Sequence, residues 1–287
     1  MELFFFDIET CGEHKDYDTF LDTDERGAKL FAGKYEKMNW SDKYKDINEA
    51  YLENAGIIST YGKIVCISFG FIDNGGVSKI SSYYGDNEED IVNSFNNLLK
   101  KIETKNFNLS GFRILHFDLP WVLHKLHKYG IEPANMIYLY DKKPWDLRVV
   151  DMSDDWKGKF AWAFSFDEMC YELGVVSPKD IINGSDVHKY YWSGKIEQIK
   201  TYCEKDVHSS IEVSKRELYT GSIAFPDLPA RAGAAWDIVS AVFYKGDNAE
   251  LTDLDLYIGP SNSTLAEGPF KFSSNALNST GIKAIKA

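Results

Sequence analysis

The chain has 287 residues, with 44 acidic and 32 basic side chains, a net charge of −12, and 44% hydrophobic residues. This composition is typical of a folded globular protein and excludes a disordered, fibrous or membrane-embedded chain. The acidic balance argues against a protein that grips duplex DNA nonspecifically, because phosphate contacts need clustered Lys and Arg. An enzyme that uses divalent metal ions as its cations is still compatible with it.

Neither a targeting peptide nor disulfide bonding is predicted. The N-terminal sequence MELFFFDIET lacks the basic residues of a signal or transit peptide, and no apolar stretch reaches the length of a membrane span. The four cysteines are too few and too scattered for a disulfide framework, and they form no zinc-binding pattern. We therefore expect a cytoplasmic protein.

The first part of the chain predicts strands that are interrupted by a helical insertion. Leu3 to Phe6 is an apolar run that predicts a short buried strand. Residues from about 14 to 55 are rich in charge and tyrosine, and we interpret them as the insertion, with helices at Arg26–Lys37 and Asp46–Asn54. β-branched and alternating residues predict further strands at Lys63–Phe71 and Val77–Tyr84.

The elements that follow alternate between helix and strand. Apolar residues at helical spacing predict an amphipathic helix over Glu88–Thr104. After it we expect a strand at Arg113–Phe117, a helix at Leu119–Tyr129, an edge strand at Leu147–Asp151, and helices at Ser165–Leu173 and Lys195–Leu218. This order predicts an α/β domain with a mixed sheet flanked by helices.

The character of the sequence changes after Leu218. Residues 219–287 contain a stretch dominated by Ser, Asn and Gly, and they predict a C-terminal extension to a main domain of residues 1–218. Within the extension we expect an apolar helix at Ala234–Phe243 and an exposed strand around Leu254–Ile258. The extension can serve as a self-association arm, a docking segment for a replication or repair protein, or a flexible tail.

The strongest local signal for chemistry is Asp7-Ile8-Glu9, at the end of the first predicted strand. Because side chains alternate across a strand, both carboxylates point to the same face and can share a divalent ion. An acid pair at a strand end is also often a solvated turn, so this motif alone leaves both interpretations open.

Two further motifs carry acids. Asp118 precedes Leu119-Pro120 in the connection between a predicted strand and helix, where the sites of α/β proteins gather, although an aspartate there is commonly a helix N-cap. Tyr202 and Asp206 are four residues apart on the last predicted helix and so share one face, although such pairs also occur on solvated helices. The three motifs together favour a single acidic site.

The ordered set FDIET, FDLP and YCEKDV resembles the DEDD superfamily of 3′-5′ exonucleases, in the tyrosine subgroup (DEDDy) with Tyr four residues before the last Asp. More narrowly, the chain resembles predicted exonucleases related to the proofreading domain of family B DNA polymerases. The similarity includes NAGIISTYGKIVCISFGF, VVDMSDDWKG, SFDEMCYELGV, SPKDIINGSDVHKYYW and IEQIKTYCEKDVHSSIEV, and it covers about residues 1–218. The resemblance implies a ribonuclease H-like fold with two Mg²⁺ or Mn²⁺ ions.

Carried over residue by residue, the resemblance implies that Asp7, Glu9, Asp118 and Asp206 bind the metals and that Tyr202 orients the attacking water. We expect Asp7 to bridge the ions, Glu9 and Asp206 to hold the ion that carries the nucleophile, and Asp118 to support the other. Two hard cations make a water nucleophilic and stabilise the leaving 3′ oxygen. Ligands that are carboxylates, without Cys or His, suit Mg²⁺ or Mn²⁺ better than zinc.

The resulting hypothesis is a metal-dependent 3′-5′ exonuclease that acts on single-stranded DNA ends and releases nucleoside 5′-monophosphates. An exoribonuclease of the same superfamily is an alternative, because no residue is identified that reads the 2′-hydroxyl. A noncatalytic module that binds nucleic acid or a partner is a second alternative, which the complete set of four acids and the tyrosine argues against.

Two residues are weaker candidates for substrate contact. Thr10 follows Glu9 directly, and its hydroxyl can meet the terminal nucleotide or simply satisfy nearby backbone. Arg113 stands where related sequences tend to have an asparagine. It can contact a phosphate bidentately or pair with a surface acid, and the second interpretation is slightly favoured.

Overall fold

The computed structural model describes residues 2–72, 78–105, 107–139, 142–143, 146–157, 164–177, 182–220, 253–258 and 267–273. The chain divides into two compact units, Met1–Ser214 and Lys215–Ala287. The described strands are β1 Glu2–Gly12, β2 Gly62–Ile72, β3 Ser78–Tyr84, β4 Phe107–Gly111, β5 Val149–Asp151, β6 Asp253–Ile258 and β7 Glu267–Ser273. The described α-helices are α1 Tyr17–Thr23, α2 Glu25–Lys37, α3 Ile47–Asn54, α4 Glu88–Ile102, α5 Asp118–Lys128, α6 Met152–Lys157, α7 Phe166–Leu173, α8 Val187–Trp192 and α9 Ile196–Thr220.

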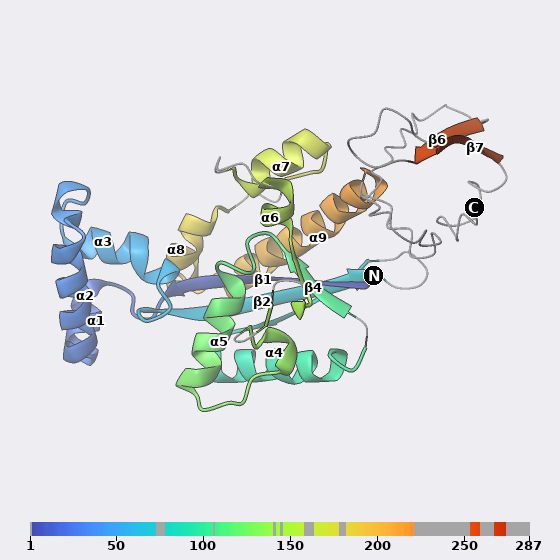
Figure 1. Ribbon diagram of the computed structural model, residues 1–287. Coiled ribbons are helices and arrows are strands. Elements are labelled where there is room, and N and C mark those ends of the chain that lie inside the picture. Colours follow the sequence, from blue (N-terminus) through green and yellow to red (C-terminus); the bar gives the residue numbers. More distant parts are fainter. Residues whose placement is uncertain are drawn as a thin grey trace. The chain divides into compact units, whose positions relative to one another are not determined.

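A mixed five-stranded sheet in the order β3-β2-β1-β4-β5 forms the centre of the first unit (Figure 1). β1 pairs antiparallel with β2, which pairs antiparallel with β3. On its other edge β1 pairs parallel with β4, which pairs parallel with β5. This strand order, with helices on both faces, confirms the mixed α/β, ribonuclease H-like sheet expected from the sequence.

The side chains of β1 serve two cores because they alternate between the faces of the sheet. Phe4, Phe6 and Ile8 pack in the largest apolar cluster, which contains the buried faces of α4 and α5. On the opposite face, Phe5 and Cys11 belong to two separate clusters, each of which includes residues of α9. Helix α9 is therefore held to β1 at two places.

Two predictions about strands near the candidate acids are wrong. β1 does not end at Phe6 but continues to Gly12, because β2 pairs with it along that whole length, with a register shift after Glu9. The strand expected at Arg113–Phe117 is instead β4 at Phe107–Gly111, and residues 112–117 form turns. The apolar run there is misleading because Ile114 is buried from a loop, and the backbone at Arg113, with φ of 62°, cannot continue a strand.

The helices between β1 and β2 begin at aspartates. Asp16, Asp24 and Asp46 each accept a backbone N–H from the first turn of α1, α2 and α3. Helices α2 and α3 confirm the two helices predicted in this segment, whereas α1 was not predicted. An aromatic cluster that includes Phe20 and Phe31 holds the three helices together. Several acids of the segment therefore have a structural role.

In the second unit, β6 and β7 form an antiparallel pair. β6 confirms the strand predicted around Leu254–Ile258, and the helix predicted at Ala234–Phe243 lies outside the described residues. Among the described residues, no helix combines the length and apolar character needed to cross a bilayer.

Candidate metal centre

Asp7 and Glu9 lie inside β1, on the face that packs against α9. They fall between Phe5 and Cys11, so a polar gap separates the two apolar clusters of that face. Burial, followed by the charges of Asp206 and Asp118, raises the pKa of Asp7 well above its usual range. Burial and the Asp7 charge likewise raise the pKa of Glu9, which is 8% exposed. Two partly desolvated carboxylates thus share one small volume.

Asp118 is the first residue of α5, and a long-range hydrogen bond holds its side chain. The Ile8 N–H donates to Asp118 Oδ1 at 3.0 Å. β4 pairs with β1 only as far as Phe5, so the carboxylate takes the place of a strand partner beyond that point. The N-cap alternative is wrong, because Phe117 occupies the cap position without a side-chain bond. Burial raises the pKa of Asp118 to about 7, against the lowering effect of the Ile8 bond.

Helix α9 brings Tyr202 and Asp206 to the same place. The Asp206 charge raises the pKa of Asp7, Glu9 and Asp118, which places its carboxylate near all three. Tyr202 is 8% exposed, and burial followed by the Asp206 charge raises its pKa, so its phenol is neutral and able to donate a hydrogen bond. The structure therefore brings the four acids and the tyrosine singled out by the sequence into one site.

Asp151 supports this site and was not identified from the sequence. Its buried carboxylate accepts N–H groups from Arg113 at 3.0 Å, Leu115 at 2.9 Å and Ser153 at 2.9 Å. These bonds fix the loop that leads into Asp118. Its position at the end of a predicted edge strand was the signal available in the sequence.

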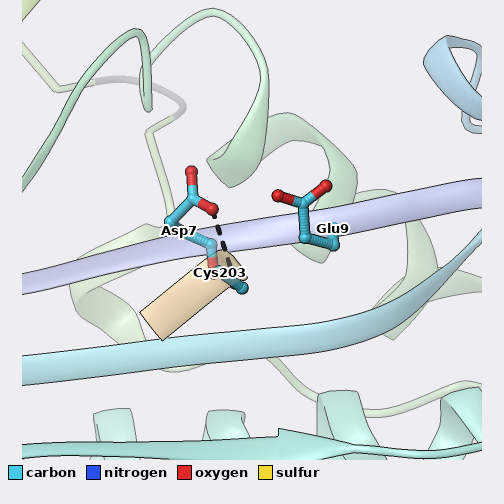
Figure 2. A group of neighbouring side chains, drawn as sticks. All are labelled: Asp7, Glu9 and Cys203. Carbon is cyan, nitrogen blue, oxygen red and sulfur yellow. Dashed lines mark hydrogen bonds between the residues drawn. The ribbon is translucent and has the colours of Figure 1, made fainter. Parts of the chain in front are cut away.

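Cys203 is the second residue that sequence reasoning missed. Its thiol lies 3.4 Å from the Asp7 backbone oxygen and 3.4 Å from Asp7 Oδ2. The dashed line in Figure 2 marks the hydrogen bond between Cys203 and the Asp7 carboxylate. One atom each from Asp7, Glu9 and Cys203 lie within 4.8 Å of one another. A thiol therefore borders the acids. The signal was its place three residues before Asp206, on an adjacent part of the helix face.

The two weaker candidates have clear structural surroundings. The Thr10 hydroxyl donates to the Gly56 carbonyl at 2.5 Å, which ties β1 to the segment that follows α3. Arg113 is exposed, and its guanidinium makes no hydrogen bond or ion pair with any described residue. The interpretation that Arg113 pairs with a surface acid thus finds no support in the described part of the chain.

The chemistry of the site follows from its concentration of negative charge. Within the described residues, no Lys or Arg makes an ion pair with Asp7, Glu9 or Asp118. Carboxylate oxygens that repel one another and lack a cationic side chain are suited to a hard divalent cation. The residues present therefore fit a divalent metal centre.

Comparisons with known proteins give one family match and a similar solved structure. Residues 57–222 match the family model described as a predicted 3′-5′ exonuclease related to the exonuclease domain of PolB. A search of curated proteins finds no match. Among solved structures, the family B DNA polymerase from the hyperthermophilic archaeon Pyrobaculum calidifontis is similar, with a TM-score of 0.48 and 15% sequence identity. The match covers 77% of this chain and 25% of that polymerase, so the chain spans about a quarter of its length.

Proposed function

Because the chain belongs to the family of predicted 3′-5′ exonucleases related to the exonuclease domain of PolB, we propose that it removes nucleotides from the 3′ end of single-stranded DNA. The products are nucleoside 5′-monophosphates. The observation that carries this proposal is the convergence of Asp7, Glu9, Asp118 and Asp206 from β1, α5 and α9, beside the phenol of Tyr202.

The cofactor in this proposal is a pair of Mg²⁺ or Mn²⁺ ions held by the four carboxylates. When bound, such ions make a water nucleophilic and stabilise the leaving 3′ oxygen. The protein supplies preorganised oxygen ligands: β1 fixes Asp7 and Glu9 on one face, and the bond from Ile8 N–H fixes Asp118. The mutual repulsion of these acids is relieved when cations enter or when protons bind.

Tyr202 acts as a neutral hydrogen-bond donor in this mechanism. Burial and the Asp206 charge raise the pKa of Tyr202, which keeps the phenol neutral at neutral pH in the metal-free protein. Its role in the proposal is to orient the attacking water by a hydrogen bond. A pocket of about 90 Å³ lies beside it and is lined by Ile182, Gln198, Thr201 and Lys205. Tyr202 therefore borders both the acids and this small pocket.

The test is degradation of 5′-labelled single-stranded DNA and of an RNA of the same sequence, with Mg²⁺, Mn²⁺ or chelator. We expect a ladder that shortens from the 3′ end of DNA, mononucleotide products, and loss of both with chelator and in Asp7→Asn. Tyr202→Phe should lower kcat about a hundredfold with little change in KM, since it removes one positioned donor. Asp22→Asn, an exposed acid on α1, is the matched control that should retain activity.

The same experiment decides between the alternatives. Faster degradation of RNA than of DNA would make the chain an exoribonuclease. Absence of cleavage of both strands in both metals would contradict the catalytic proposal and favour a noncatalytic module.

We include Arg113 in this proposal as a substrate contact. Its backbone is held in the left-handed region, with φ of 62°, by the N–H bond to Asp151, and its guanidinium is exposed next to the loop into Asp118. A guanidinium without a partner is suited to a backbone phosphate. Arg113→Asn keeps a residue that tolerates this conformation, so it should raise KM several-fold without loss of stability. Thr10 is kept as a weaker contact, because its hydroxyl proton is already donated to Gly56.

A further inference from the structure

We propose that Cys203 gives the candidate metal centre a sulfur ligand, so that a thiophilic ion such as Zn²⁺ or Cd²⁺ binds there with Asp7 and Glu9. The inference rests on the metal centre of the proposed function. It adds a ligand, and a class of inhibitory ion, that the carboxylates alone do not predict.

The separation of the three ligand atoms suits a single ion of this class. In a tetrahedral zinc site, a sulfur ligand and an oxygen ligand lie about 3.6 Å apart, given metal–ligand bonds of about 2.3 and 2.1 Å. The Cys203 sulfur is 3.4 Å from Asp7 Oδ2, and the cluster of three atoms lies within 4.8 Å. Figure 2 shows the Asp7 and Glu9 carboxylates side by side above Cys203. The three ligand atoms are therefore close enough to share one ion.

The surroundings of the thiol favour a soft ion once one enters. Cys203 is fully buried in the apolar cluster that contains Cys66, so water does not compete for its sulfur. In the metal-free protein the thiol is protonated and donates to Asp7. When the metal–sulfur bond forms, the S–H bond breaks and its proton goes to solvent, leaving a thiolate and two carboxylates around a dication.

The same geometry separates two classes of metal. Mg²⁺ requires near-octahedral oxygen ligands and gains nothing from the thiol, whereas Zn²⁺ and Cd²⁺ bind thiolate strongly. A thiophilic ion that occupies Asp7 and Glu9 also takes ligands that the hard ions need. Such an ion is therefore expected to stop nucleotide removal at concentrations far below those of Mg²⁺.

The proposal is tested by titrating the full chain with Co²⁺ and Cd²⁺ and recording the thiolate-to-metal charge-transfer band in the ultraviolet. We expect the band in the wild type and in Cys170→Ser, whose cysteine is equally buried but contributes no atom to the cluster. It should be absent in Cys203→Ser, and Cd²⁺ affinity should fall about tenfold or more. The affinity for Mn²⁺ should change by less than about twofold, because no oxygen ligand is removed.

Each outcome decides the proposal separately from the exonuclease assignment. A missing band in the wild type, or a band that persists in Cys203→Ser, would overturn the sulfur ligand even if the protein degrades DNA with Mg²⁺. A band that depends on Cys203 would support it even if no nuclease activity were found. If Cys203→Ser does not fold, cadmium NMR of the wild type decides, since a sulfur ligand shifts the cadmium resonance far from that of an all-oxygen site.

Discussion

Replacing Asp118 with asparagine should make the metal-free protein more stable while abolishing most of its activity. An asparagine side chain keeps an oxygen that accepts the Ile8 N–H, so the buried bond is preserved. The substitution also removes the negative charge of Asp118, which burial and repulsion from Asp151 and Asp206 make unfavourable in the folded protein. In the proposed function the charge serves to bind a cation, so stability and activity are expected to change in opposite directions.

The magnitude follows from the pKa of Asp118. Its folded-state value of about 7 lies above the ordinary value of 3.8, so the folded state binds the proton more tightly than the unfolded state. The tighter binding of this proton adds to the free energy of unfolding. The addition is complete below pH 3.8, is lost as pH rises to 7, and is absent at pH 8. That rise in pKa corresponds to about 4 kcal/mol, and a neutral acceptor weakens the Ile8 bond by about 1 kcal/mol. The neighbouring acids also change their protonation when one charge is removed, so the two effects do not simply add. For Asp118→Asn at pH 8 we therefore expect the free energy of unfolding to rise by about 2 kcal/mol.

The assay is thermal unfolding of the wild type, Asp118→Asn and Asp118→Ala in chelator at pH 8. Asp118→Asn should raise the Tm by about 4 to 8 °C, whereas Asp118→Ala gains less because it leaves the buried Ile8 N–H without a partner. Saturating Mn²⁺ should reverse the order of the wild type and Asp118→Asn, and the rate of DNA degradation should fall about a hundredfold in both variants. A lower Tm for Asp118→Asn than for the wild type in chelator would refute the reasoning.

Three further predictions concern the support of the site. His188 Nδ1 accepts the Gly12 N–H at 3.1 Å, and burial lowers the histidine pKa below 6.5, so the stability that His188 contributes should fall as pH drops below 6.5; the urea midpoint of the wild type should exceed that of His188→Gln by more at pH 8 than at pH 5.5. Glu88 is buried and holds two lysine ammonium groups at 3.3 and 3.1 Å, so Glu88→Ala should lower the free energy of unfolding by about 3 to 5 kcal/mol, whereas the exposed neighbour Glu89→Ala should change it little. Asp151→Ala leaves three backbone N–H groups without their acceptor, so we expect a loss of about 3 kcal/mol in denaturant unfolding and a rise in the Mn²⁺ concentration needed for activity; unchanged metal dependence would show that the loop does not position Asp118.

Local periodicity was enough to place part of the candidate site. A period of two along a strand puts Asp7 and Glu9 on one face, and a spacing of four along a helix puts Tyr202 and Asp206 on one face. Helical segments were also predicted at α2, α3, α4, α5, α7 and α9, and for α4 the reason was the helical spacing of its apolar residues. These features depend only on residues that are neighbours in sequence.

The tertiary structure decided how these parts work together. Asp118 is a partner of β1 and not an N-cap because its oxygen meets the Ile8 N–H, 110 residues away in sequence. Asp151 shapes the loop before Asp118 from another strand, and Cys203 reaches Asp7 because α9 packs on β1 at two apolar clusters. Such contacts depend on which segments meet in the folded chain. The sequence alone therefore determined which pairs of residues share a face of a strand or helix. The packing determined which groups hydrogen-bond to these side chains, bury them and lie beside them.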